Sequence, residues 1–347
     1  MRRPAIAYAL LSAALFGAST PLAKLLIGSV DPLLLAGLLY LGSGVGLGAW
    51  LLARSFDKAS RTRSAIRGWP WLMAAIAAGG IVGPALLMYG LARMDAATSS
   101  LLLNLEPVVT ALLAWVVFRE NVDARVFTGM TVIVGGGALL SWEHVPQAGS
   151  FSGPLLIAGA CLAWAIDNNL TRRVSGGDAA VLAAIKGCGA GAVNLSLALA
   201  MGAALPAPGS IALAGVIGLL GYGVSLTLFI MALRELGTAR TSAYFSVAPF
   251  FGAALAIALL REPATPAFWA AAGLMALGVW LHVTERHEHA HVHKPLTHDH
   301  PHVHDEHHRH AHDFDWDGGE PHAHVHRHDA LRHRHPHYPD LHHRHEH

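Results

Sequence analysis

Two stretches of this sequence decide its fold: YGLARMDAATSSLLLNLEPVVTALLAWVVFRE at residues 89–120 and MALRELGTARTSAYFSVAPFFGAALAIALLRE at residues 231–262. They align without a gap at an offset of 142 residues (231 minus 89). Identical residues recur at matched positions: Leu91 with Leu233, Ala97 with Ala239, Pro107 with Pro249, and Arg119-Glu120 with Arg261-Glu262. Upstream of them, Phe16-Gly17-Ala18 aligns with Trp164-Ala165-Ile166. The alignment indicates that the chain contains two related halves.

The composition places both halves in a membrane. Of the 347 residues, 53% are apolar and only 14% are charged, and the mean hydropathy is +0.41 although the C-terminal segment is very polar. A soluble protein of this length needs more charge to cover its surface. A helix needs about 20 apolar residues to cross a bilayer, and ten such runs are predicted: 4–28, 32–53, 70–92, 96–118, 126–142, 153–171, 179–203, 209–232, 239–260 and 266–283.

The predicted fold class is an all-α integral membrane protein with ten transmembrane helices and a histidine-rich tail. Each half holds five predicted spans, and an odd number makes the second half enter the membrane from the opposite side. Inverted repeats of this kind are typical of transporters, whose binding site lies near the midplane where the repeats meet. The expected domains are a first repeat at 1–142, a second repeat at 150–283 and a tail at 285–347.

Basic residues predict the orientation, because Lys and Arg concentrate in cytoplasmic loops. With the N-terminus inside, the cytoplasmic side receives most of them: Arg2, Arg3, Arg54, Lys58, Arg61, Arg63, Arg67, Arg119, Arg125, Arg172, Arg173, Arg234, Arg240 and Arg286. The outer loops receive Arg93 and Arg261, with Lys24 near the first. We therefore expect a multi-pass protein of a bacterial-type inner membrane with both termini in the cytoplasm.

Three sequence elements resemble EamA-type members of the drug/metabolite transporter superfamily. They are the run from Leu105-Glu106-Pro107 to Arg119-Glu120, its weaker copy from Ala248-Pro249 to Arg261-Glu262, and the run from Trp164 to Arg172. The resemblance covers residues 1 to about 283. It implies this ten-helix fold and the transport, often outward, of amino acids, nucleoside and sugar derivatives or other metabolites. Ala248 replaces Glu106 in the second copy, which departs from a symmetric pair of carboxylates.

Polar groups inside the predicted spans are the candidate substrate or coupling pathway, since ionisable groups in lipid are expensive and usually functional. The candidates are Glu106, Asn104, Asp167, Asn168, Lys186, Ser19, Thr20, Trp164, Tyr222 and Tyr244, with Ser242 as a weaker addition. The repeat aligns Ser19-Thr20-Pro21 with Asp167-Asn168-Asn169, which suggests two walls of one pathway. Pro21 is expected to break the first helix, as in transporters with interrupted helices.

Each candidate has a structural alternative. Glu106 either couples to protons or contacts substrate, or it satisfies backbone groups released around Pro107. Asp167 and Lys186 are predicted to form a buried ion pair, which either opens during transport or stays closed. Asn169 is assigned to interhelical hydrogen bonding. Lys24 is expected to extend its ammonium group to the membrane interface.

The tail carries 23 of the 25 histidines, and residues 287–310 recur at 322–345 with an offset of 35 (322 minus 287). A segment with so little to bury is expected to be disordered. Neutral imidazole binds zinc, nickel, cobalt and copper. The predicted metal ligands are the recurring histidines: His287, His289, His291, His293, His298, His300, His302, His307, His308, His310, His322, His324, His326, His328, His333, His335, His337, His342, His343 and His345.

The leading hypothesis is a secondary transporter that exports or exchanges a small polar metabolite by alternating access. One alternative is efflux of a divalent transition metal, or transport regulated by such a metal through the tail. The other is a metal-binding membrane protein that transports nothing. No nucleotide-binding, HExxH or GxSxG motif is present, so an enzyme is not expected. The expected partners are the lipid bilayer, a small solute and divalent metal ions, without nucleic acid or a cofactor for transport; a homodimer is left open.

Overall fold

The computed structural model describes residues 3–57, 68–118, 124–148, 151–171, 178–236, 241, 244–284, 288–293, 296–302, 322–328 and 331–336. Its contacts divide the chain into two units, Met1–Glu285 and Arg286–His347. The first unit is helical and the described part of the second consists of strands.

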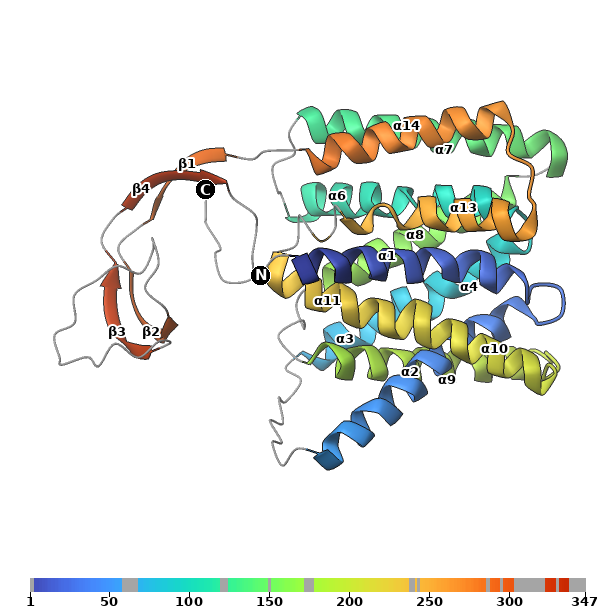
Figure 1. The fold of residues 1–347 in the computed structure, drawn as a ribbon, viewed down its shortest axis with the longest axis horizontal. Helices are drawn as coiled ribbons and strands as arrows, with labels where there is room; N and C mark the ends of the chain where they lie inside the picture. The colour runs from blue at the N-terminus through green and yellow to red at the C-terminus, as the bar shows by residue number, and fades with distance from the viewer. Residues whose placement is uncertain are drawn as a thin grey trace. The chain divides into compact units, whose positions relative to one another are not determined.

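The first unit is a bundle of helices that run roughly side by side (Figure 1). Two of its stretches, η1 and η2, are π-helical. Its elements in chain order are α1 (Arg3–Lys24), α2 (Pro32–Asp57), α3 (Trp69–Ala75), η1 (Ile76–Val82), α4 (Gly83–Leu91), α5 (Ala96–Leu102), α6 (Leu105–Phe118), α7 (Ala124–Ala148), α8 (Ser152–Thr171), α9 (Ala179–Ala200), α10 (Pro208–Gly218), η2 (Leu219–Val224), α11 (Ser225–Leu236), α13 (Ala248–Leu260) and α14 (Pro266–Val283).

Seven of the described helical stretches are long and apolar enough to cross a membrane: Pro4–Lys24, Pro32–Arg54, Trp69–Leu91, Ala96–Leu113, Ala124–Glu143, Ala179–Ala200 and Pro208–Ala232. Two shorter apolar helices, Ala248–Leu260 and Pro266–Leu281, lie in the ninth and tenth predicted runs. Helix α8, with 20 residues, lies in the sixth. The multi-pass membrane architecture is thus supported, and the count of ten stays a prediction.

The fifth helices of the two repeats, α7 and α14, pack together at one edge of the bundle (Figure 1). A methyl group added to Gly136 would meet the Ala271 carbonyl, and one added to Gly278 would meet the Gly129 carbonyl. Gly278 and Ala271 lie 142 residues after Gly136 and Gly129. Exchanging the repeats therefore converts one contact into the other, as a two-fold axis requires.

The second helices, α2 and α9, obey the same exchange. Asp31 accepts hydrogen bonds from the first backbone N–H groups of α2, as Asp178 does for α9, which aligns these helices at an offset of 147 (178 minus 31). Gly44 lies against Cys188, and Gly191 lies against Leu41. These two contacts interchange at that offset, so one axis relates both pairs of helices.

Irregular backbone also occurs at equivalent places in the two repeats. The third span of the first repeat contains η1, and the third span of the second contains η2 at the same offset of 142. The fourth span is interrupted by a turn at Leu103–Asn104, and its counterpart by a turn at Ser246–Val247. Non-helical backbone at membrane depth is tolerated only where protein or a cavity surrounds it, so these places mark the protein interior.

One expectation about the helices is wrong. Helix α1 continues through Pro21 and ends at Lys24, because proline is tolerated where neighbouring groups surround the freed carbonyl; the Gly17 carbonyl lies against Gly252 of α13. The fourth run contains one apolar span, Ala96–Leu113, in which a turn separates α5 from α6. In the ninth run, residues 241, 244 and 245 are helical before α13 begins at Ala248, and residues 239, 240, 242 and 243 lie outside the described ones.

The described tail segments form strands β1 (Glu288–His293), β2 (Leu296–His302), β3 (His322–His328) and β4 (Leu331–Pro336). Strand β1 pairs antiparallel with β4, and β2 with β3. The first segment of each copy thus pairs with the second segment of the other. These strands follow the period-two pattern of the alternating histidines, and the disorder expected for the tail stays a prediction. His287, His307, His308, His310, His337, His342, His343 and His345 lie outside the described residues.

Candidate functional site

An ion pair lies at the centre of the candidate site, between α8 and α9. The Lys186 ammonium donates to the two carboxylate oxygens of Asp167 at 2.6 and 2.8 Å. Thr171 Oγ1 donates to Asp167 Oδ1 at 2.7 Å and lies 3.1 Å from Lys186 Nζ. Asp167 and Lys186 are both buried. The predicted pair is therefore present, and a hydroxyl one helical turn after Asp167 completes it as a triad.

The π-turn η1 lies against the Asp167 carboxylate of this triad, and side chains from three other helices bind its carbonyl groups. A Cβ atom at Gly79 would overlap the Asp167 carboxylate, so glycine is needed for the carboxylate to approach. Tyr40 Oη and Trp164 Nε1 each donate to the Gly79 carbonyl at 2.9 Å. Asn194 Nδ2 donates to the next two carbonyls, at 3.2 and 3.4 Å. In lipid, backbone polar groups must be satisfied internally, so these donors stabilise the irregular turn.

A second carboxylate lies beside the triad. Asn168, which follows Asp167 on α8, donates from Nδ2 to Glu106 Oε1 at 2.8 Å. Glu106 lies in the first turn of α6, directly after the interruption of the fourth span, and its carboxylate interacts electrostatically with that of Asp167. Glu106 is thus bonded to a neutral amide, whereas the neighbouring Asp167 is bonded to an ammonium group.

An aromatic cluster joins this site to the second repeat. Phe16 of α1 packs edge-on against Trp164 and Tyr222, with ring centroids 6.1 and 5.9 Å apart. Tyr222 of η2 lies 5.2 Å from Tyr40 of α2, and Phe245 lies 5.4 Å from Phe16. The Tyr222 hydroxyl is buried and has no hydrogen-bond partner. The two π-turns thus meet through aromatic rings, with one free hydroxyl among them.

The equivalent position in the second repeat has different chemistry. A Cβ atom at Gly221, the counterpart of Gly79, would meet the Cβ atom of Ser19, the counterpart of Asp167. At the offset that relates α2 to α9, the counterpart of Lys186 is Leu39, which is fully buried. The backbone contact is thus repeated, whereas the ion pair occurs in one repeat alone.

The remaining predicted residues lie in several places. Ser19 Oγ donates to its own helix at the Phe16 carbonyl, and Thr20 is buried. Asn104 is directed away from Glu106, with Nδ2 bonded to the Leu101 carbonyl and close to Met275 of α14. Tyr244 is half-buried before α13. Ser242 lies outside the described residues.

Sequence reasoning missed five contributors: Tyr40, Thr171, Asn194, Phe16 and Gly79. Thr171 could have been found, because it lies four residues after Asp167 and so on the same helix face. Tyr40 and Asn194 carried a weaker signal as isolated polar groups in apolar runs. Gly79 was indistinguishable from the many other glycines of the spans, because its role depends on a contact with α8.

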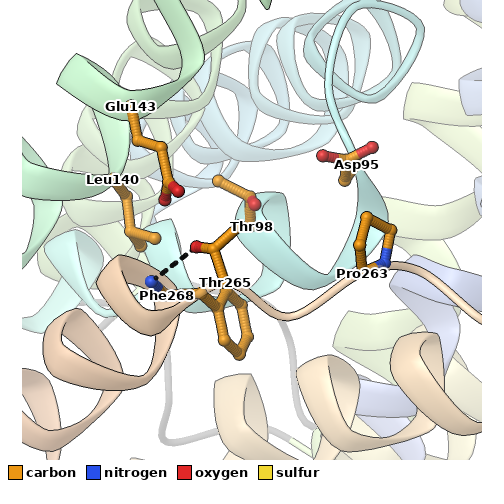
Figure 2. Close-up of a pocket in the computed structure, with 7 residues that line it drawn as sticks. All are labelled: Asp95, Thr98, Leu140, Glu143, Pro263, Thr265 and Phe268. Atoms are coloured by element: carbon orange, nitrogen blue, oxygen red, sulfur yellow. Dashed lines mark hydrogen bonds between the residues drawn. The ribbon is translucent and has the colours of Figure 1, made fainter.

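A small cavity of about 40 Å³ lies away from the ion pair, where α5, α7 and the start of α14 meet (Figure 2). It is lined by Asp95, Thr98, Leu140, Glu143, Pro263, Thr265 and Phe268. The Phe268 backbone N–H donates to Thr265 Oγ1 at 3.1 Å. Sequence reasoning did not identify this cavity.

Asn169 Nδ2 donates to the Ala165 carbonyl within α8, so the described hydrogen bond of this residue is local rather than interhelical. The Lys24 ammonium group donates to the Leu91 and Met94 carbonyls at 2.5 and 2.7 Å, and its expected place at the membrane interface stays a prediction. In the part of the chain that the structure describes, no group of three or more His, Cys, Asp or Glu side chains could hold a metal ion.

The comparisons with known proteins agree with this geometry. Residues 3–142 and 151–284 each match the model of the EamA-like transporter family. The chain is 26% identical over 263 residues to an uncharacterized transporter of Methanothermobacter thermautotrophicus, covering 72% of this chain and 77% of the relative. It is 38% identical over 113 residues to a probable 4-amino-4-deoxy-L-arabinose-phosphoundecaprenol flippase subunit ArnE of Pseudomonas paraeruginosa, covering 31% of this chain and 93% of the relative.

A solved crystal structure shares the fold. It superposes with a TM-score of 0.61 at 19% identity and covers 81% of this chain and 98% of its own. Since both family matches together span most of the first unit, and each coincides with one of the two-fold-related halves, the chain belongs to the EamA-like transporter family.

Proposed function

We propose that this protein is a secondary transporter that exports or exchanges a small polar metabolite by alternating access. The observation that carries the proposal is the buried Asp167–Lys186 pair with Thr171, together with the Glu106–Asn168 hydrogen bond beside it. Polar and charged groups inside a membrane protein are costly and commonly mark a substrate or proton pathway. The family membership supports the same conclusion.

The two acids of the cluster have separable roles in this proposal. Asp167 is neutralised by Lys186, so a solute that competes for either partner can open the pair. Glu106 is bonded to a neutral amide, and a charge inside lipid needs neutralisation by a proton or by a positively charged group. Glu106 therefore binds the coupling proton, and Asn168 links its state to the neighbouring Asp167.

The test is solute flux in proteoliposomes with a panel of small polar metabolites, driven by a pH gradient or by counterflow. Glu106→Gln should abolish accumulation driven by the pH gradient while counterflow persists, because the proton site is lost and the route remains. Asp167→Asn should reduce both. Asp31→Asn is the matched control, since this acid caps α2 and belongs neither to the cluster nor to the lining of the cavity.

Wild-type rates in both Glu106→Gln and Asp167→Asn would remove these residues from the mechanism. Absence of flux for every solute, with the protein folded, would favour the non-transporting alternative. Transport direction follows from comparing metabolites in the medium of a deletion strain with those of an overexpressing strain.

We also propose that the tail binds divalent transition metals such as zinc or nickel and regulates transport. The duplication of one histidine-rich unit supports this role, because ten histidines of residues 287–310 recur at the same spacing in residues 322–345. Metal titration of the full-length protein, compared with a chain ending at residue 284, measures the contribution of the tail. Equal binding by both chains would contradict the proposal. Metal resistance of cells carrying each chain would distinguish regulation from metal efflux.

A further inference from the structure

A further contact between the repeats involves Glu262, which has no role in the candidate site. Its two carboxylate oxygens accept hydrogen bonds from the backbone N–H groups of Ala96 and Ala97 at 2.8 and 2.7 Å. These are the first N–H groups of α5, which have no partner within their own helix. Asp95 stands at the N-cap position of α5, and its side chain makes no capping bond. A residue of the second repeat thus caps a helix of the first.

Lys24 holds the preceding part of the chain, the connection of residues 92–95 between α4 and α5. Its ammonium group binds the Leu91 carbonyl at the end of α4 and the Met94 carbonyl in the connection that follows, so opposite charges stabilise the backbone groups at the two ends of residues 92–95. Lys24 and Glu262 also attract each other electrostatically. One short connection is therefore fixed by α1 and by the segment between α13 and α14.

This contact and the ion pair lie at opposite ends of α8. A Cβ atom at Gly153, near the start of α8, would meet Met94, whereas Asp167 is near its end. Residues 153 and 167 are roughly 20 Å apart along the helix at about 1.5 Å per residue. The Glu262 contact joins the two repeats at one end, while the Asp167–Lys186 pair lies within one repeat toward the other.

We propose that Glu262 is a latch that holds its end of the bundle closed, and that releasing its carboxylate from the α5 amide groups opens the solute route there. Alternating access requires the repeats to move relative to one another, and a bond between repeats has to change in such a movement. The inference rests on the proposed function only for the existence of a route.

Cysteine labelling in nanodiscs tests the latch, because both ends of the protein face one solution and no substrate is needed. Cys161 and Cys188 are first replaced by Ala. Thr98→Cys then reports on the cavity beside the latch (Figure 2), and Asn169→Cys reports on the opposite end of α8. In Glu262→Ala, labelling at position 98 should rise roughly fivefold to tenfold, in line with the loss of a helix cap. Labelling at position 169 should fall.

The opposite directions separate a latch from general loosening, which would raise labelling at both positions. Glu262→Gln, which keeps an acceptor oxygen, should give a smaller rise at position 98 than Glu262→Ala. Asp95→Asn is the matched control and should leave both rates unchanged. Unchanged rates in Glu262→Ala, or a rise at both positions, would overturn the proposal. Neither result depends on whether a transported solute has been found.

Discussion

The two π-turns of this protein are equivalent in position and different in chemistry. At η1, Gly79 admits an aspartate that is paired with Lys186 and a tryptophan that donates to the turn. At η2, Gly221 lies against Ser19. The comparison teaches that the symmetry of the fold provides a close contact between a glycine and a neighbouring helix at both π-turns, whereas the Asp167–Lys186 ion pair lies at η1.

The η2 side is held by a smaller polar contact. Ser12 Oγ donates to the Ser225 carbonyl at 2.7 Å, and Ser225 Oγ donates to the Ser12 carbonyl at 2.9 Å. The positions equivalent to Ser12 and Ser225 are Ala160 and Gly83, which cannot form it. The ion pair therefore lies at η1, whereas at η2 two serine hydrogen bonds join α1 to α11.

The largest expected effect comes from removing the charge of Lys186. Lys186→Met should lower the free energy of unfolding by about 3–5 kcal/mol, because it leaves Asp167 buried and unpaired. The double variant Asp167→Asn/Lys186→Met should recover most of that loss. Reversible unfolding in mixed micelles measures both. Leu39→Met, at the equivalent position of the first repeat, is the control and should change stability by less than about 1.5 kcal/mol.

Replacing the contact glycine of each π-turn by alanine tests whether η1 and η2 differ in function. Gly79→Ala and Gly221→Ala should each cost about 1–3 kcal/mol through overpacking. Gly79→Ala should also abolish transport, because the added atom displaces the Asp167 carboxylate from Lys186. Gly221→Ala meets the Cβ and hydroxyl of Ser19 and the Leu15 carbonyl but no charged group, and it should keep most of its transport. Equal loss of flux in both variants would show that the two sides act alike.

Removing the indole donor should have a smaller effect. Trp164→Phe places at α8 the residue that α1 has at position 16, and it should cost about 1 kcal/mol through the lost bond to the Gly79 carbonyl. Tyr40→Phe should cost a similar amount. Because both donors share one acceptor, a double-mutant cycle should show coupling between them. Strict additivity would show that the two donors stabilise the π-turn independently of each other.

The serine contact should give the smallest change. Ser12→Ala should cost about 0.6 kcal/mol, the usual value for a polar contact between membrane helices. Ser225→Ala should match it, and the double variant should add little, since each serine is a partner of the other. Transport per folded protein should stay near wild type. A selective loss of flux would place function on the η2 side as well.

Sequence reasoning predicted the features that repeat or that stand out chemically. The gapless alignment of 89–120 with 231–262 predicted the two halves, and their two-fold contacts appear in α7 and α14. Asp167 and Lys186 could be paired from sequence because two opposite charges at similar depth in lipid need each other. The pair is present in the structure, and its role in transport stays a prediction.

The features that sequence reasoning missed depend on packing between helices. Pro21 predicted a break in the first helix, yet α1 continues through it, because α13 packs against the Gly17 carbonyl that the proline leaves without its helical partner. The pairing of Glu106 with Asn168 joins α6 to α8, and no periodicity within one helix encodes it. Sequence reasoning used Arg261-Glu262 only as a marker of the repeat. The contact of Glu262 with α5 could not be predicted in the same way, because it depends on how the two repeats pack together.

The exchange of contacts between α7 and α14 bears on ancestry. If a single five-helix chain once formed this assembly from two identical copies, one glycine would have satisfied both the Gly136 and the Gly278 positions. In such a dimer, an aspartate and a lysine beside the π-turn of the third span would necessarily have appeared twice. Joining two copies into one gene removes that constraint, so that one half can carry Asp167 and Lys186 while the other carries Ser19 and Leu39 at the equivalent positions.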